Sequence, residues 1–468
     1  MNVLKRSEKR LYDRLYHQIK FPPMIMELLD CPGLLRLRDV RMANNQFVAF
    51  PAFANSSRYE HSLGVCYLAG VCADKLGLSE KDKIELMMAG LYHDVGTPPF
   101  AHAMEEVLKA QFEFDHEQNL ENLITGDTGD FDQDLAQIYL GQSLKLKSVC
   151  QTSKKARNLG IDPHRIARLA VGDKSDGLSA LINGSGMDLD NIDNICRAVS
   201  AMGFVEEKVD FSILATELAS SFIFKDGKIF YDKKYAKQIE KWLSLRDAQY
   251  TEIYRSIDDF SYQAMIKKAI RQLGKHEKKR KLGKNLWRLT DSEFTYQYLL
   301  AEPESRPLME RVLLCRPYPL LALLYVRGKG SIQYVNTHIR EIEEQIGVYL
   351  SSEYGFERYE KEGLVLANYY PDKRHRWIPE ERWVGQGTVK HGEHWEEGAI
   401  LGLFTSSKVG GYVTGSNGDR SLRRFDNKNI PSLIEKVQKS LKDFEVMEYG
   451  KENKGHNSTI DGDGQLGF

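Results

Sequence analysis

The chain has 468 residues, 42% of them hydrophobic, a length that allows two or three domains with an extensive core. Its 65 Lys and Arg residues balance 66 Asp and Glu residues, so no global charge draws it to nucleic acid or to an anionic membrane, although local basic patches can still exist. Six scattered cysteines without a CxxC pair argue against a disulfide framework or a zinc ribbon, and the apolar runs are too short to span a bilayer. The N-terminal residues lack the apolar segment of a signal peptide, so we predict a cytoplasmic protein without membrane spans.

Hydrophobic periodicity predicts mostly helices from about residue 24 to about residue 330. Residues 24–40 divide into two short pieces at Pro32-Gly33. A helix that begins near His61 is expected to stop at Gly77, and the next one has Ser79 as its N-cap. Further helical patterns occupy residues 163–170, a stretch from about 191, and two stretches within 234–273 that are divided near Asp258-Asp259, whereas the basic run 275–284 reads as a solvated loop.

The pattern changes after about residue 330. Residues 360–425 contain β-type segments with the turn signal Asn417-Gly418, residues 426–446 are predicted to be helical, and the polar, glycine-rich end is predicted to be disordered. We therefore predict a mainly α fold with four parts: an N-terminal segment 1–23, a helical core with its extension 24–330, a smaller α+β appendage 331–446, and a disordered tail 447–468.

His93 and Asp94 are adjacent at the end of the helix that Ser79 begins. Their side chains can both reach one metal ion, and mixed nitrogen and oxygen ligands suit a catalytic divalent cation better than a closed structural zinc site. His61 joins them if its helix packs antiparallel to theirs. A fourth ligand should be a carboxylate on a later helix, for which Asp190 is the candidate.

Each of these residues also has an ordinary structural interpretation. The pair at 93–94 is then a dipeptide at a helix end, and the acids at 188, 190 and 193 are solvated residues at a helix start, where they suit the helix dipole. A second cluster, His375, His391 and His394, lacks a helical pattern, so we interpret it as a surface loop.

Several motifs occur in the order of a known family: DCPGLLRLR (30–38), RYEHSLGV (58–65), HDVGTPPFAH (93–102), DHEQ (115–118), MDLDNID (187–193) and LTDSEF (289–294). In this set the sequence resembles the HD-domain deoxynucleoside triphosphate triphosphohydrolases, which include bacterial dGTPases and a human enzyme with a sterile-alpha-motif domain. The resemblance covers about residues 24–330 and is strongest at 30–120.

The resemblance implies a mostly helical fold and hydrolysis of a dNTP to a deoxynucleoside and triphosphate. It implies a divalent transition metal (Mn, Fe, Co or Zn), Mg with the nucleotide, a homo-oligomer and a possible nucleotide activator. The metal ligands that it implies are His61, His93, Asp94 and Asp190. Such a set neutralises a dication and leaves positions open for water and phosphate.

By the same resemblance, His102 is the general acid and Glu105, one helical turn later, orients it. His116 contacts phosphate and Arg58 holds a phosphate oxygen. The nucleotide-contacting residues implied are Arg58, Arg246, Tyr250 and Tyr254, and those implied for an activator are Asp30 and Arg38.

The sequence departs from the family at four positions. Thr97 replaces a histidine of the human enzyme, Leu35 replaces a glutamine, and Asn194 and Ala198 replace a tyrosine and an aspartate that touch the sugar. These changes leave two alternatives to a dNTP triphosphohydrolase: a phosphohydrolase acting on another nucleotide or phosphate ester, and a nucleotide-sensing regulatory protein.

Overall fold

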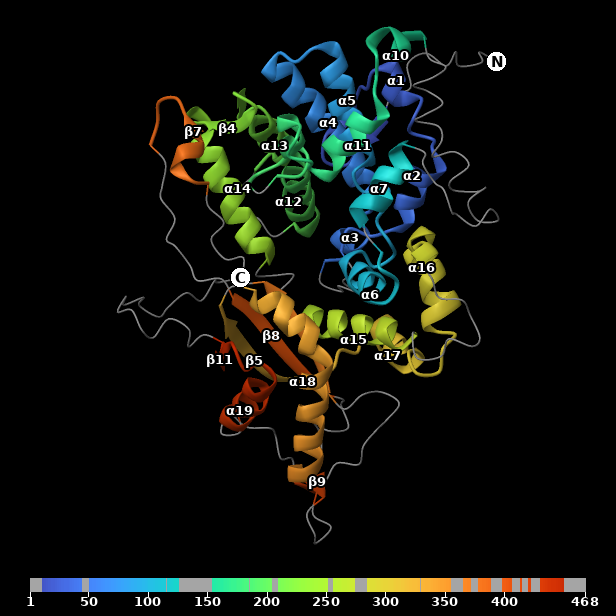
Figure 1. Ribbon diagram of the computed structural model, residues 1–468, viewed down its shortest axis with the longest axis vertical. Helices are drawn as coiled ribbons and strands as arrows, with labels where there is room; N and C mark the ends of the chain where they lie inside the picture. Colours follow the sequence, from blue (N-terminus) through green and yellow to red (C-terminus); the bar gives the residue numbers. More distant parts are fainter. Residues whose placement is uncertain are drawn as a thin grey trace. The chain divides into compact units, whose positions relative to one another are not determined.

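The structure is a computed structural model, and every structural statement below refers to the residues that it describes, which are 11–43, 50–114, 116–125, 154–184, 186–203, 209–250, 256–273, 284–328, 330–354, 365–371, 378–388, 398–405, 413–414, 420–421 and 430–449. These residues fall into two compact units (Figure 1). Unit 1 draws on Met1–Arg316 and His375–Glu393, and unit 2 draws on Pro317–Arg374 and His394–Phe468.

Unit 1 is mainly helical. Its α-helices are α1 (Pro23–Met26), α2 (Pro32–Arg36), α3 (Pro51–Ala54), α4 (Arg58–Leu76), α5 (Glu80–Tyr92), α6 (His102–Phe112), α7 (His116–Thr125), α10 (Lys154–Leu159), α11 (Pro163–Val171), α12 (Leu189–Met202), α13 (Phe211–Ala219), α14 (Ala236–Gln249), α15 (Ile257–Leu273), α16 (Asp291–Phe294) and α17 (Arg306–Leu313). Shorter turns are η1 (Leu37–Asp39), η2 (Gly177–Leu181), η3 (Lys233–Tyr235), η5 (Lys284–Arg288), η6 (Thr295–Leu299) and η7 (Glu380–Arg382).

Small sheets complete unit 1. An antiparallel pair joins β1 (Leu11–Asp13) to β2 (His17–Ile19). A three-stranded sheet has the order β3 (Phe222–Lys225), β4 (Lys228–Asp232) and β7 (Trp383–Val384). Because β7 pairs with β4, the segment around it belongs to unit 1 although it follows much of unit 2 in the sequence.

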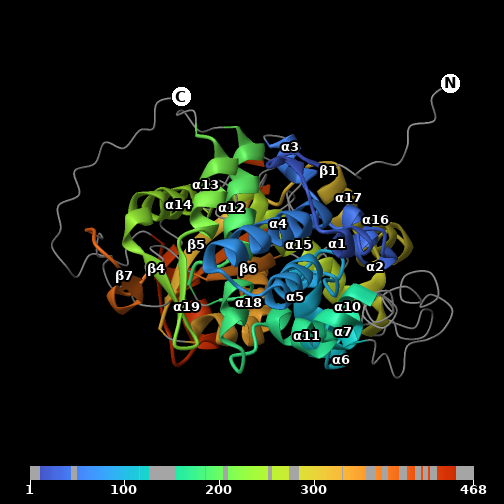
Figure 2. The same cartoon turned by 90° about the horizontal axis from the view of Figure 1, so that it is seen from above.

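Helix α4 lies between α5 and α12, which Figure 2 shows from above. Its residues are buried on nearly all sides, and two glycines allow its neighbours to approach closely. A Cβ at Gly90 of α5 would lie 3.2 Å from the backbone of Val65 on α4, and one at Gly64 of α4 would lie 1.8 Å from the Asp193 carboxylate on α12. This packing brings the N-terminus of α4, the C-terminus of α5 and the N-terminus of α12 together.

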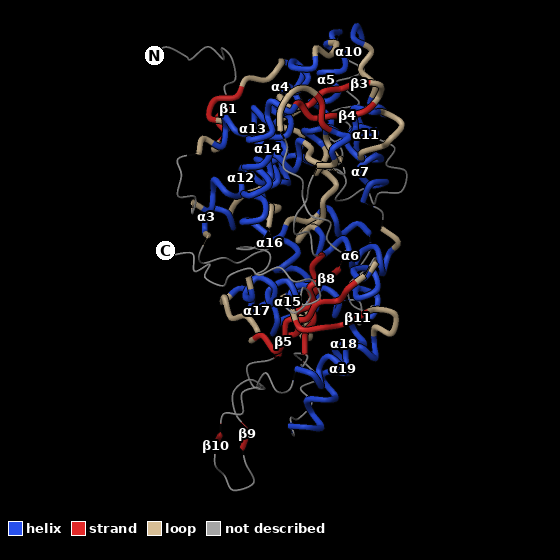
Figure 3. Tube along the Cα trace, turned by 90° about the vertical axis from the view of Figure 1, so that its left-hand side faces the viewer, coloured by secondary structure: helices blue, strands red, loops and turns tan. Residues whose placement is uncertain are grey.

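Unit 2 follows the order β5 (Leu320–Arg327), α18 (Ser331–Tyr354), β6 (Val365–Pro371), β8 (Gly398–Thr405), β9 (Val413–Thr414), β10 (Arg420–Ser421), α19 (Ile430–Ser440) and β11 (Glu445–Glu448). The antiparallel sheet order β11-β5-β8-β6 makes it a ferredoxin-like, split βαβ arrangement. Figure 3 labels strands β5, β8 and β11 of this sheet, in red, and the helices α18 and α19, in blue. Alternate residues of β5, namely Ala322, Leu324 and Val326, pack with apolar residues of α18 and α19 in one core.

The predicted mainly α fold with a smaller α+β part is confirmed. Gly77 ends α4 with a φ of 65°, and the Ser79 side chain accepts a hydrogen bond from the Asp82 amide at the start of α5, both as predicted. Strands β9 and β10 pair on either side of Asn417-Gly418, as a hairpin there requires. The basic loop 275–284 and the predicted disordered tail lie outside the described residues, apart from Lys284, which opens η5, and residues 447–449, where β11 ends.

Three predicted boundaries differ from the structure, and two β elements were missed. Helix α12 begins at Leu189 because Asp188 caps it, and α15 begins at Ile257, so Asp258-Asp259 lie in its first turn and not at a break. The hairpin β3–β4 was missed although Asp226-Gly227 has the positive φ angles of a tight turn. Strand β5 shows no alternation because it is half-buried or buried at every position, and β11 follows α19 where a continuous helix was predicted.

Candidate metal centre

His61 lies in the first turn of α4. Ser57 caps this helix and accepts a hydrogen bond from the Glu60 amide, which fixes where the helix begins. The imidazole is 1% exposed. Its Nδ1 lies 2.8 Å from Asp193 Oδ2, so the ring donates from Nδ1 and directs Nε2 to the opposite side.

His93 is the C-cap of α5, and Asp94 follows it. The Nδ1 of His93 donates to the Gly90 carbonyl at 2.8 Å. This bond directs Nε2 of His93 toward the cluster, as the Asp193 contact directs that of His61. In both rings Nδ1 carries the donated proton, so Nε2 is the nitrogen that faces a metal ion.

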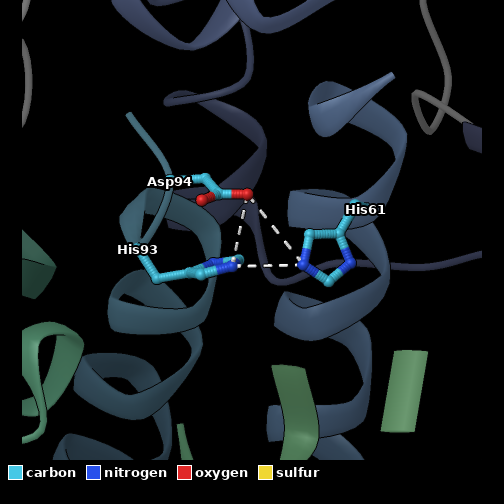
Figure 4. Close-up of side chains that lie close together, drawn as sticks. All are labelled: His61, His93 and Asp94. Carbon is cyan, nitrogen blue, oxygen red and sulfur yellow. Dashed lines mark hydrogen bonds and ion pairs between the residues drawn. The ribbon is translucent and has the colours of Figure 1, made fainter. Parts of the chain in front are cut away.

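Four side chains converge at the helix ends. His61 Nε2 and His93 Nε2 are 3.2 Å apart, and Asp94 Oδ2 lies 4.0 Å from the first and 3.6 Å from the second (Figure 4). Asp190, the second residue of α12, places Oδ1 2.8 Å from His61 Nε2 and 3.8 Å from His93 Nε2. The structure thus brings together all four predicted ligands.

These distances fit one metal ion. Nitrogen and oxygen ligands lie about 2.1 Å from such an ion, so neighbouring ligands at right angles are about 3 Å apart and opposite ligands about 4 Å apart. The distances between either histidine Nε2 and its neighbours in the cluster lie between 2.8 and 4.0 Å. Two neutral imidazoles and two carboxylates also balance a dication, and the cluster His61, His93 and Asp94 is buried. The site therefore fits a divalent metal, whose identity the ligand set does not determine.

Asp94 is held in its ionised form by its neighbours. Burial alone raises the pKa of its carboxyl, but the Arg58 guanidinium and the two imidazoles outweigh burial and hold the pKa far below its usual range. Arg58 Nη1 lies 2.7 Å from both Asp94 oxygens, and the Thr97 hydroxyl donates to Oδ1 at 2.9 Å. The carboxylate is consequently charged and fixed in orientation.

The pKa of His61 is shifted upward, whereas that of Asp94 is shifted downward. Burial lowers its pKa, but hydrogen bonds to the carboxylates of Asp190 and Asp193 outweigh burial and raise the pKa to about 9. In the metal-free protein the ring is therefore protonated at neutral pH. A metal ion must displace this proton from Nε2.

The loop after Asp94 is tied down on both sides. Arg36 donates to the carbonyls of Val95 and Thr97 at 3.2 and 2.6 Å, and Asp291 accepts from the Phe100 amide at 2.9 Å. Phe100 and Ala101 have φ angles of 57° and 45°, which side-chain-bearing residues rarely adopt. These bonds hold a strained turn that delivers His102.

His102 is the first residue of α6, and its side chain is 91% exposed. Its Nδ1 donates to Glu105 Oε2 at 2.8 Å, which is the predicted contact between the two residues. The Glu105 charge also acts on Arg58, so the pair lies near the metal cluster.

The remaining predicted site residues lie on other elements. Arg246 is fully buried on α14, with its guanidinium 4.3 Å from the ring centre of Tyr250. Asp30 and Arg38 are exposed near α2, and Arg38 Nε donates to the Leu35 carbonyl. His116 begins α7, but its side chain lies outside the described residues, as do Tyr254 and the histidines at 375, 391 and 394.

Several residues next to the candidate ligands were not identified from the sequence. Asp188 and Asp193 are buried, at 1% and 0% exposure, so the interpretation that they are solvated was wrong. Asp193 follows Asp190 by three residues and therefore shares its helix face, a spacing that could have indicated a second partner for His61. Thr97 and Arg36 carried no such signal, because their partners are a side chain and carbonyls brought near by the fold.

Residues 58–148 match the family model of the HD domain. The chain contains an HD domain. Over 129 residues it is 33% identical to the deoxynucleoside triphosphate triphosphohydrolase SAMHD1 of Bos taurus, a match that covers 25% of this chain and 22% of that protein. It is 33% identical to the human SAMHD1 over 121 residues, which cover 24% of this chain and 19% of that protein. The predicted resemblance is thus confirmed, over about a fifth of the relatives' length.

Two further similarities extend beyond the HD domain. An uncharacterized protein of Methanocaldococcus jannaschii is 23% identical over 263 residues, 56% of this chain and 49% of that protein. The crystal structure of a hypothetical protein from Aquifex aeolicus matches with a TM-score of 0.59 and 20% identity, covering 86% of this chain and 98% of that chain. The latter likeness concerns the fold alone.

Metal affinity should increase with pH because metal and proton compete for His61 Nε2. Below the His61 pKa of about 9, binding releases one proton, so the dissociation constant should fall about tenfold per pH unit between pH 6 and pH 8. Competition with a chelator of known proton affinity at several pH values measures this slope. A dissociation constant that does not change over this range would contradict the protonated apo state.

Replacing Asp190 by Ala should remove the metal, because three ligands with a net single charge hold a dication far less tightly. We expect affinity to fall by more than the roughly 10- to 100-fold loss typical of residues outside the ligand set. Metal content after dialysis provides the measurement, with Asp173→Ala, a partly exposed acid elsewhere in unit 1, as control. A normal metal content in the Asp190 variant would show that Asp190 is not a ligand.

Proposed function

We propose that this protein is a metal-dependent phosphohydrolase that converts deoxynucleoside triphosphates to deoxynucleosides and triphosphate. One observation carries the proposal: His61, His93 and Asp94 converge within the segment that matches the HD domain, which also contains His102 and Glu105, and Asp190 joins them from α12. The similarity of this segment to dNTP triphosphohydrolases supports the choice of substrate.

The residues around the cluster suit attack on a phosphate ester. A divalent ion bound there supplies a Lewis acid and an acidified water. Arg58, with its guanidinium against Asp94, adds positive charge where phosphate oxygens would bind. The carboxylates of Asp94 and Asp190 stay ionised, since the pKa of each is lowered by its cationic partners despite burial.

His102 is suited to protonate the leaving 5′-oxygen. Its Nδ1 is engaged by Glu105, so Nε2 is the atom that holds the proton for the leaving group. The high exposure of the ring leaves it accessible to a substrate that enters from solvent. Glu105 acts by orienting the ring.

Further assignments belong to the same proposal. The resident metal is one of Mn, Fe, Co or Zn, and Mg accompanies the nucleotide. His116 contacts phosphate, and Arg246, Tyr250 and Tyr254 contact the nucleotide. A nucleotide activator binds at Asp30 and Arg38, and the chain forms a homo-oligomer in the cytoplasm. None of the described helices is long and apolar enough to cross a membrane.

A second candidate is hydrolysis of another nucleotide or phosphate ester at the same cluster. Ala198, where relatives have a sugar-contacting aspartate, packs in an apolar group with Ala43, Phe53 and Met202. An apolar contact there offers no hydrogen bond to a sugar hydroxyl. This observation weakens the selection for deoxyribose and leaves the metal chemistry intact.

Product analysis tests the proposal directly. Metal-loaded protein is incubated with each dNTP, NTP and dNMP, with and without GTP or other dNTPs as activators, and the products are separated. We expect a deoxynucleoside and inorganic triphosphate from dNTPs. Release of monophosphate alone would contradict the proposal, and turnover of NTPs or dNMPs but not dNTPs would favour the second candidate.

His102→Ala should retain the metal and lose turnover, because the ligand set is intact while the proton donor is gone. A loss of about 100- to 10,000-fold in kcat is expected for a general acid. The control is His164→Ala, an exposed histidine on α11 outside the site. Wild-type turnover in the His102 variant would refute its role as the acid.

A further inference from the structure

A carboxylate stands behind the metal cluster on the far side of His61. Asp193 lies on α12 one helical turn after Asp190, so the two acids share a helix face. His61 is held between them, with Nε2 toward Asp190 and Nδ1 toward Asp193, each at 2.8 Å. Asp193 is completely buried.

The Asp193 carboxylate has no hydrogen-bonding capacity left. Its Oδ2 accepts from His61 Nδ1 and from Arg197 Nε at 2.9 Å. Its Oδ1 accepts from Arg197 Nη2 at 3.0 Å and from the Tyr16 hydroxyl at 2.8 Å. These four bonds use the four lone-pair sites of a carboxylate, so the group cannot rotate without breaking some of them.

The β1–β2 hairpin anchors this group from the N-terminal side. Asp13, the last residue of β1, accepts from Arg197 Nη1 at 3.1 Å with one oxygen. Its other oxygen accepts from the amides of Leu15 and Tyr16 at 2.7 and 2.8 Å. The Arg197 guanidinium also lies 5.7 Å from the ring centre of Tyr16. The ion pair between Asp13 and Arg197, together with the contact between Arg197 and the Tyr16 ring, thus attaches the hairpin to α12.

Gly64 of helix α4 leaves space for the Asp193 carboxylate and the Arg197 guanidinium because it has no side chain. A Cβ at Gly64, three residues after His61, would lie 1.8 Å from Asp193 Oδ1 and 2.5 Å from Arg197 Nη2. Neither atom can withdraw without losing its bonds. The absence of a side chain at this position therefore permits the contact between His61 and Asp193.

We propose that Asp193 is a positioning residue that sets the orientation and tautomer of His61 for metal binding, and that Arg197, Tyr16 and Asp13 hold it in place. The proposal rests on the metal site proposed above. It gives the N-terminal hairpin a role in metal affinity although the hairpin supplies no ligand.

The physical reason lies in the two ring nitrogens of His61. A metal binds a neutral imidazole, and the proton must then stay on the other nitrogen. A fixed carboxylate at Nδ1 keeps it there, prevents the ring from turning, and increases the electron density at Nε2. Loss of such a partner typically weakens metal binding about 10- to 100-fold.

The test compares metal dissociation constants of full-length variants at 25 °C, measured with Mn or Zn by chelator competition. Asp193→Asn should raise the constant about 10- to 100-fold. Its control is Asp259→Asn, which alters another completely buried aspartate of unit 1, on α15. Circular dichroism confirms that each variant is folded at the temperature of the measurement.

Tyr16→Phe is the second variant, because it removes one hydroxyl and keeps the packed ring. It should raise the metal dissociation constant several-fold, whereas Tyr262→Phe, which removes the hydroxyl of a buried tyrosine on α15, should leave it unchanged. This variant keeps the proposal testable if Asp193→Asn does not fold.

Two negative outcomes are distinguishable. If the wild-type protein binds no divalent metal, the proposed function fails at that point. If it binds metal and both variants bind equally well while their melting temperatures fall, the group of Asp193 and the hairpin is a structural brace only. That second result would overturn the positioning role and leave the proposed function intact.

Discussion

Two buried imidazole nitrogens that face each other at 3.2 Å, between two carboxylates, are the constraint on which the rest of the site depends. Lone pairs so close repel each other unless a cation lies between them. A single proton on His61 satisfies them in the metal-free state, and a dication satisfies all four groups at once. A positive charge between the helix ends therefore offsets the repulsion among these groups.

Buried partners fix each ligand in turn. The Gly90 carbonyl orients His93, Arg58 and Thr97 orient Asp94, and Asp193 orients His61. Asp190 is the exception, since its side chain is 37% exposed. Three of the candidate ligands are therefore held by buried partners, and the fourth is partly exposed to solvent.

The sequence predicted what depends on local signals. Ser79 and Gly77 carry the chemistry of a helix start and a helix end, and the adjacent His93 and Asp94 need no long-range contact to be recognised. The partners of the ligands depend on tertiary contacts: Asp193 meets His61 across 132 positions and Tyr16 meets Asp193 across 177. Strand β5 was missed for a related reason, because a strand that is half-buried or buried at every position loses its alternation. Asn194 and Ala198 differ from the family's sugar-contacting residues, so the sequence did not predict which sugar is bound. Ala198 packs among apolar residues, which offer no hydrogen bond to a sugar hydroxyl.

X-ray absorption at the metal edge of the reconstituted protein tests this metal centre most directly. We expect a first shell of nitrogen and oxygen only, at about 2.0 to 2.2 Å, with the outer-shell scattering of two imidazoles. Substitution of either His61 or His93 should remove one imidazole contribution. A sulfur ligand, or a spectrum without imidazole, would contradict a metal centre built from the ends of α4, α5 and α12.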